Sequence, residues 1–197
     1  MKKEFKAIAD LLPKNVTVLD VGCGDGSLMN LLIKEKKIKV RGLEIKEEHV
    51  TKCISKGLSV IEGDAETELN QFPNQSFDFV ILSQTLQAFY NPEKVLKDLL
   101  RVGKYAIVSI PNFGYWKVRT NLLFFGKMPV TKTLPNTWYN TPNLHMCTIK
   151  DLFNFCSDKK IKINKIIGLN ENKTSEIKKS NLEIKNLFSK IGIFQLS

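Results

Sequence analysis

The chain of 197 residues has the length of one domain, and its 43% hydrophobic and 25% charged residues are ordinary proportions for a globular protein. No run of about 18 apolar residues exists, which excludes a helix that spans a bilayer. The net charge of +10 comes mostly from residues 111–197, with 14 Lys/Arg against 5 Asp/Glu. Because only three basic residues of the whole chain are arginines, we expect a solvated basic face or an acidic partner rather than nucleic-acid binding.

The first residues predict a short amphipathic helix. Apolar residues recur at helical spacing from Phe5 to Leu12, and the acids Glu4 and Asp10 make the segment untypical of a signal peptide. The four cysteines include no C-x-x-C pair, which argues against structural zinc. We therefore expect a reduced, cytoplasmic setting and no bound metal.

Strand-like and helix-like segments then alternate up to residue 110. Short β-branched or aromatic runs predict strands at 17–21, 39–44, 58–62, 77–83 and 105–110. Apolar residues at three- and four-residue spacing predict helices at 27–36, 47–56 and 92–101, with Ser27 and Asn91 as N-caps. This alternation is typical of an α/β fold, with a mostly parallel sheet and helices on both faces.

Residues 111–147 break the alternation, because they are rich in aromatic residues and contain four prolines. A helix is expected at 116–125, an irregular stretch at 126–146, and a second helix from the capping-box-like Thr148 and Asp151 to about Cys156. Strands at 160–169 and 191–196 follow, joined by an exposed polar connection at 170–189. We interpret residues 1–197 as a single domain with an aromatic-rich insertion at about 111–147.

The most informative segment is 18–27, where an apolar strand ends in Gly22, Gly24 and Gly26 and a helix follows at once. Glycines at such a turn let the backbone bend sharply and approach a ligand, and the helix N-terminus offers free N–H groups to an anionic group. The spacing departs from the dinucleotide-binding G-x-G-x-x-G, because Ser27 stands in place of the third glycine, and it lacks the P-loop pattern. A turn that merely packs a helix on the sheet is the alternative.

Acidic residues lie at the ends of three successive predicted strands: Asp20, Glu44 and Asp64. The carboxyl ends of parallel strands meet at one edge of a sheet, where ligands bind. The Glu44 carboxylate could accept hydrogen bonds from both hydroxyls of a ribose, and Asp64 could accept one from an exocyclic amine such as that of adenine. Either acid alone is more typical of a solvated loop, but their repetition favours a ligand role.

Together the turn and the acids resemble the class I S-adenosylmethionine-dependent methyltransferases, and the chain more closely resembles the MetW family of bacterial methionine-biosynthesis proteins. The resemblance covers roughly residues 15–170. Its first segment, the glycine turn, is shared by many methyltransferases, whereas its later segments are specific to this family. The segments that carry it are 19–26 (LDVGCGDG), 77–87 (FDFVILSQTLQ), 101–103 (RVG), 111–114 (PNFG), 128–131 (MPVT) and 138–149 (WYNTPNLHMCTI).

The resemblance implies a Rossmann-like, seven-strand, mostly parallel sheet whose antiparallel last strand lies between the fifth and the sixth. It also implies a site for S-adenosylmethionine or S-adenosylhomocysteine. In that site Asp20, Gly22 and Gly24 would line the methionine moiety, Ser83 and Gln84 the sulfonium side, Glu44 the ribose, and Asp64 with Ala65 the adenine; Cys23 and Ile45 complete the predicted set.

For function, the resemblance implies association with homoserine O-acyltransferase, whose full activity would require this chain. The aromatic insertion would then be either the docking surface or a lid packed over the ligand. A domain that binds S-adenosylmethionine, which is made from the pathway's product, could also report product abundance to that partner.

The alternative is an active methyltransferase acting on a small molecule, with Trp116, Trp138, Tyr139 and His145 shaping the acceptor pocket. His145 is a weak candidate for a catalytic base, with a structural hydrogen-bonding role as its alternative, whereas His49 is expected to be structural or solvated. Residues 82–85 (LSQT) replace the Asn/Asp-Pro-Pro-Tyr signature of enzymes that methylate base amines, which argues against a nucleic-acid substrate.

Overall fold

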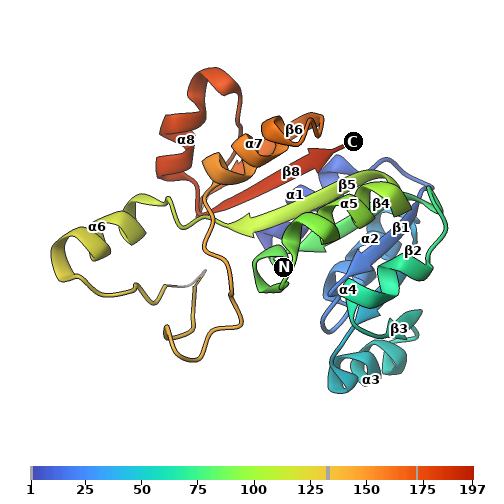
Figure 1. Ribbon diagram of the computed structural model, residues 1–197. Coiled ribbons are helices and arrows are strands. Elements are labelled where there is room, and N and C mark those ends of the chain that lie inside the picture. Colours follow the sequence, from blue (N-terminus) through green and yellow to red (C-terminus); the bar gives the residue numbers. More distant parts are fainter. Residues whose placement is uncertain (1, 132–133, 172) are drawn as a thin grey trace.

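The computed structural model describes residues 2–131, 134–171 and 173–197, and an eight-stranded sheet forms its centre (Figure 1). The strand order is β3-β2-β1-β4-β5-β8-β6-β7. The first five strands pair in parallel, and β8 runs antiparallel between β5 and β6, which confirms the predicted Rossmann-like topology. The strands are β1 (Thr17–Val21), β2 (Lys39–Glu44), β3 (Val60–Glu62), β4 (Phe77–Ser83), β5 (Gly103–Pro111), β6 (Ile163–Leu169), β7 (Thr174–Glu176) and β8 (Ile191–Leu196).

The eighth strand corrects the predicted count of seven. β7 joins the edge of the sheet beside β6, inside the stretch 170–189 that was expected to be an exposed polar connection. The same stretch contains a 3-10 turn, η3 (Lys179–Asn181), and the helix α8 (Leu182–Phe188), with Ile177 and Leu182 buried. The prediction of an exposed connection was wrong because a few apolar side chains among the many lysines and asparagines are enough to pack the segment on the core.

Helices cover both faces of the sheet, as the alternating pattern predicted. α1 and α2 pack on Val18, Ile81 and Ile107, which point to one face. α5 and α7 pack on the neighbouring side chains of the same strands, which point to the other face. The remaining helices are short, or lie at the edge near β3, or belong to the insertion. The helices are α1 (Lys3–Leu11), α2 (Ser27–Lys36), α3 (Glu47–Ser55), α4 (Ala65–Glu68), α5 (Pro92–Val102), α6 (Trp116–Phe125) and α7 (Ile149–Asp158), with 3-10 turns η1 (Leu69–Gln71) and η2 (Leu86–Ala88).

Two of the three predicted helix starts are confirmed. Asn91 accepts a hydrogen bond from the N–H of Lys94, and Thr148 forms a reciprocal capping box with Asp151. Ser27 is not the N-cap of α2. The N-cap is Gly26, which has the left-handed conformation, and the Ser27 hydroxyl instead donates to Asp25. A left-handed residue at this position is what the tight turn before α2 requires.

The insertion extends away from the sheet (Figure 1). α6 projects at one end of the molecule, and the described residues 126–131 and 134–148, between α6 and α7, contain no helix or strand. Several of its large apolar side chains face solvent, among them Leu123 (77% exposed), Phe124 (73%) and Phe125 (71%). None of the helices in the described ranges is long and apolar enough to cross a membrane.

Candidate functional site

The turn between β1 and α2 is built from three glycines in the left-handed region, with φ of +68° at Gly22, +55° at Gly24 and +74° at Gly26. L-residues with a Cβ avoid this region. A Cβ on Gly26 would lie 2.3 Å from Leu58 Cδ1, so this glycine lets the turn pack tightly. A Cβ on Gly24 would meet nothing within 4 Å, because this residue faces an open crevice.

Glu44 closes this turn from the neighbouring strand. Its Oε2 accepts a hydrogen bond from the Gly24 N–H at 2.7 Å, and its Oε1 accepts one from the Lys46 N–H at 3.0 Å. The side chain is buried, yet each carboxylate oxygen keeps a second lone pair that can accept a further donor. Two hydroxyls on adjacent carbons, as in a ribose, are suited to such a pair of acceptors.

The crevice at this edge of the sheet has two compartments. The first, of about 430 Å³, is lined by Glu44, Ile45, Asp64 and Ala65. The second, of about 380 Å³, is lined by Asp20, Cys23 and Ser83. Gly22, Gly24, Gln84 and His49 line both compartments and so join them. The structure therefore brings all ten residues predicted for the site to one crevice, although their roles toward a ligand stay predictions.

Asp64 lies at the rim of the first compartment and also begins a helix. Its Oδ1 accepts from the Glu66 N–H at 2.9 Å, which caps α4, a helix that the sequence analysis did not predict. The side chain is exposed, whereas the following Ala65 is buried. The first compartment also contains two neighbouring aromatic side chains, the buried Phe89 and the exposed Tyr90, that sequence reasoning missed.

Asp20 is the buried acid of the second compartment, with 1% of its surface exposed. Its Oδ2 accepts no hydrogen bond from the described residues. Burial, and secondarily the charge of Glu44, raise the pKa of this carboxyl from 3.8 to about 7. A cationic ligand group would satisfy the oxygen and favour its ionised form, so this compartment is chemically suited to an ammonium or a sulfonium.

Comparison with known proteins identifies the family. The family model of the methionine biosynthesis protein MetW matches residues 2–196. The chain belongs to the MetW family. It is also 33% identical over 156 residues to a protein of Rhodopirellula baltica described as bifunctional methionine biosynthesis protein MetXA/MetW. The match covers 75% of this chain but only 25% of that relative, so this MetW chain corresponds to about a quarter of the larger protein.

Solved structures share the fold of this MetW protein. A S-adenosylmethionine-dependent methyltransferase from Thermotoga maritima superposes with a TM-score of 0.71 at 21% identity, covering 98% of this chain and 86% of its own. The [4+2]-cyclase SpnF superposes with a TM-score of 0.62 at 18% identity, covering 83% of this chain and 59% of its own. At these identities the likeness shows the fold alone, and the fold is shared by proteins described with different reactions.

Glu4 is a residue of this MetW protein that sequence reasoning did not connect with the site. It lies on α1, is buried, and lines the second compartment. Its Oε1 accepts from the Ser83 hydroxyl at 3.0 Å and from the Ser109 hydroxyl at 2.5 Å, and its Oε2 accepts from Gln84 Nε2. The only sequence signal was an acid near the start of a predicted amphipathic helix, which gives no indication of the strand ends it reaches.

His49 also lies in the crevice, although the sequence analysis expected it to be structural or solvated. Its Nδ1 is 3.8 Å from Glu44 Oε1, is buried, and has no hydrogen-bond partner among the described residues. It is the third residue of α3 and lies in its first turn, so its side chain reaches back toward the end of β2. Helical spacing alone placed it on a surface helix and could not reveal which neighbour that surface faces.

The structure does not bring the aromatic acceptor pocket together as predicted. His145 lines a separate cavity beside η2, and its backbone N–H donates to the Gln87 carbonyl. Trp138 lines a small depression within the insertion, and Trp138 and Tyr139 are each 74% exposed. Of the insertion, Pro142 and Asn143 reach the first compartment. Among the described residues, no group of three or more His, Cys, Asp or Glu side chains is arranged to hold a metal ion.

Proposed function

We propose that this chain binds S-adenosylmethionine, or its demethylated product, in the crevice described above. Glu44 would hold the ribose hydroxyls, Asp64 and Ala65 the adenine with Ile45 beside it, and Asp20 with the turn from Gly22 to Gly24 the methionine moiety. The observation that carries the proposal is that two acceptors flank one glycine turn. Glu44 has both carboxylate oxygens available to a pair of ribose hydroxyls, and Asp20 has a buried oxygen without a hydrogen-bond partner among the described residues.

Bound S-adenosylmethionine would supply a methyl group activated by its sulfonium. In the second compartment the buried carboxyl groups of Glu4 and Asp20 would lie near that charge. Ser83 and Gln84 orient the Glu4 carboxylate through hydrogen bonds. This arrangement favours a cationic ligand over a neutral one of the same shape.

We further propose that the protein supports homoserine O-acyltransferase by associating with it in the cytoplasm. Two observations support the association: membership in the MetW family, and the Rhodopirellula relative whose name joins MetXA and MetW in one longer protein. The four free thiols suit a reducing compartment. Binding of S-adenosylmethionine would report product abundance to the partner through a coupling free energy of ~1–3 kcal/mol.

Of the two functions expected for the aromatic insertion, docking is the one that its exposure favours. A lid packed over the ligand would bury its apolar side chains, but Leu123, Phe124 and Phe125 at the end of α6 are each more than 70% exposed. Exposed aromatic side chains grouped on one element are typical of protein interfaces. We therefore propose α6 as the part of the surface that contacts the acyltransferase.

Co-purification with the acyltransferase, followed by an assay of homoserine acylation, tests this function. We expect the two proteins to elute together, and the rate of acylation to rise when this chain is added and to change again when S-adenosylmethionine is added. A rate that is the same with and without this chain would exclude the supporting role. A rate that responds to the chain but not to S-adenosylmethionine would exclude only the sensing.

A second candidate, an active methyltransferase for a small molecule, is favoured by one observation. Glu4 places a carboxylate in the second compartment, where it could accept a proton from an acceptor hydroxyl or amine. Labelled S-adenosylmethionine incubated with the protein and a metabolite pool tests this candidate. Formation of S-adenosylhomocysteine that is lost in Glu4→Gln would support it, and absence of any S-adenosylhomocysteine would exclude it.

A further inference from the structure

A second cavity, of about 440 Å³, opens between α5 and α7. Its lining includes Leu86, Leu96, Leu152 and Phe155, and shares no residue with the two compartments of the crevice. The 3-10 turn η2 separates them, because Leu86 and Gln87 line this cavity whereas Ala88 lines the first compartment of the crevice. The volume lies within the range of small-molecule sites, and the lining is mostly apolar, as in such sites.

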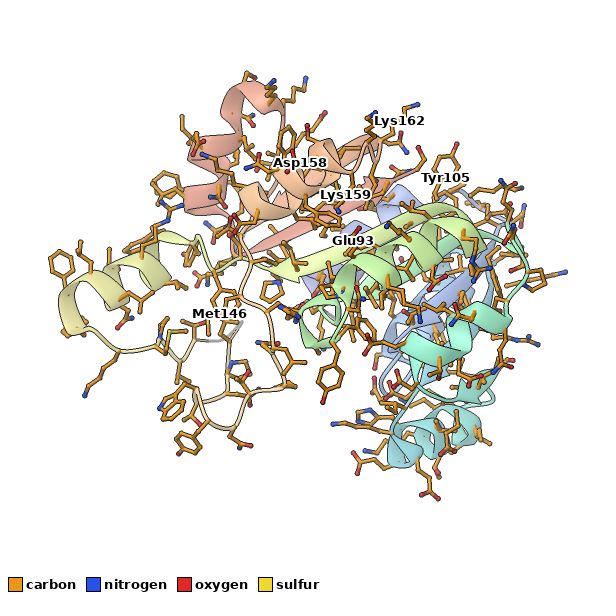
Figure 2. The ribbon with its side chains drawn as sticks, viewed as in Figure 1. Glu93, Tyr105, Met146, Asp158, Lys159 and Lys162 are labelled. Atoms are coloured by element: carbon orange, nitrogen blue, oxygen red, sulfur yellow. The ribbon has the colours of Figure 1, made fainter. Side chains whose placement is uncertain are left out.

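The walls of this cavity are held in place by the core and by ion pairs at the rim. Leu86, Leu96 and Leu152 are buried members of the main hydrophobic core. Glu93 on α5 and Lys159 just after α7 lie next to one another and form an ion pair of 2.8 Å (Figure 2). The insertion completes the wall, because the N–H groups of Leu144 and His145 donate to the Gln87 carbonyl. The cavity is therefore bounded by fixed elements.

Gln87 gives the cavity a specific polar group. The side chain is only 5% exposed, and its Nε2 donates to the Gln84 carbonyl at 2.7 Å. Because that contact requires the amide nitrogen, the atom on the other side of the amide is the oxygen. This Oε1 is buried and has no hydrogen-bond partner among the described residues. A buried acceptor without a donor is destabilising, so a donor supplied by a ligand would bind favourably.

We propose that this cavity is a second small-molecule site, for a ligand with an apolar body and one N–H or O–H donor that reaches Gln87. The charged residues at the cavity indicate which charge the ligand carries. Glu93 and Asp151 line it, and none of the described lysines or arginines does. Because Glu93 is already paired with Lys97 and Lys159, the negative charge that acts on a ligand is that of Asp151, which is hydrogen-bonded to Thr148. An amine is therefore favoured over a carboxylate on the same apolar body.

Tryptamine and indole-3-acetate are the probes, because they carry the same indole with an amine in one case and a carboxylate in the other. Binding to the full chain is measured by ligand-observed NMR titration, with S-adenosylmethionine present so that the crevice is not competing for the amine. We expect tryptamine to bind at least about tenfold more tightly than indole-3-acetate. Equal binding of the two probes, or no binding of tryptamine, would overturn the proposal.

Two variants locate the binding in the cavity. Gln87→Leu keeps the bulk of the side chain but removes the acceptor, and Leu152→Phe fills the cavity. We expect each variant to weaken the binding of tryptamine by about tenfold, because one loses a hydrogen bond and the other loses the space for the ring. The matched controls Gln71→Leu and Ile54→Phe change exposed residues outside the cavity and should bind tryptamine as the parent does. Circular dichroism identifies a variant that fails to fold. If Leu152→Phe does not fold, the result for Gln87→Leu decides. Unchanged tryptamine binding by a variant that does fold would contradict the site.

Discussion

At the scale of single residues, Glu44 shows how one carboxylate can be both structural and available to a ligand. Backbone N–H groups occupy one acceptor position on each of its oxygens. We expect Glu44→Ala to weaken the binding of S-adenosylmethionine by ~1–3 kcal/mol, measured by calorimetry, as is usual for the loss of hydrogen bonds to a charged group. Glu62→Ala, at the end of the next strand and outside the crevice, is the control. Unchanged binding by Glu44→Ala would show that this residue is wrongly assigned to the ribose.

Asp20 predicts a pH dependence of stability. The unfolded chain ionises this carboxyl near pKa 3.8, whereas the folded protein keeps the proton up to about pH 7. The native state therefore binds the extra proton between these values, and its free energy of unfolding should fall as the pH rises from about 4 to about 7, by an amount of order 4 kcal/mol. Asp20→Asn should lack this fall. Urea unfolding of both proteins at several pH values measures the difference, and parallel pH profiles would contradict it.

Glu4 predicts a preference between the two forms of the cofactor. S-adenosylmethionine carries a positive sulfonium, and S-adenosylhomocysteine carries a neutral sulfur in the same place. Glu4→Gln keeps the size of the side chain but removes its charge, so we expect it to reduce the difference between the two binding free energies by about 1 kcal/mol. Calorimetry with both ligands measures this difference, and Glu62→Gln controls for net charge. An unchanged difference would mean that Glu4 does not face the sulfonium.

At the scale of elements, α6 is rich in large apolar side chains, yet most of them are exposed to solvent. It contains Trp116, Phe124 and Phe125, yet of its residues only Val118 is buried. A helix that carries aromatic side chains without a core to pack on is typical of a surface that a partner covers.

We expect Phe124→Ser and Phe125→Ser to weaken binding to the acyltransferase by about 2 kcal/mol or more, while changing stability by less than about 0.5 kcal/mol. Co-purification and thermal unfolding measure the two effects. Ile54→Ser, on α3 and 62% exposed, is the matched control. Retention of the partner by both phenylalanine variants would move the interface away from α6.

At the scale of the whole molecule, charge is unevenly distributed along the chain. Residues 1–110 contain 16 Lys/Arg and 15 Asp/Glu, whereas residues 111–197 contain 14 and 5. We expect neither DNA nor RNA to be retained at about 0.15 M salt, because a lysine-rich surface without placed arginines gives only weak, salt-sensitive attraction. Filter binding over a salt series tests this, and retention that survives at that salt would revive a nucleic-acid function.

The sequence by itself determined the order of the strands and helices up to residue 110, apart from the short α4, and the glycine turn with the acids Asp20, Glu44 and Asp64 at the strand ends. The resemblance to the family added the other residues of the ten that meet at the crevice. Period, caps and glycine spacing are local properties, and parallel topology brings strand ends to one edge whatever the details of packing. Only the tertiary structure decided the rest. It brought Glu4 from α1 to Ser109 and His49 to Glu44, and placed His145 in a separate cavity. It also added β7 to the sheet. These depend on which surfaces meet across long separations in the chain, and no local pattern of residue types carries that information.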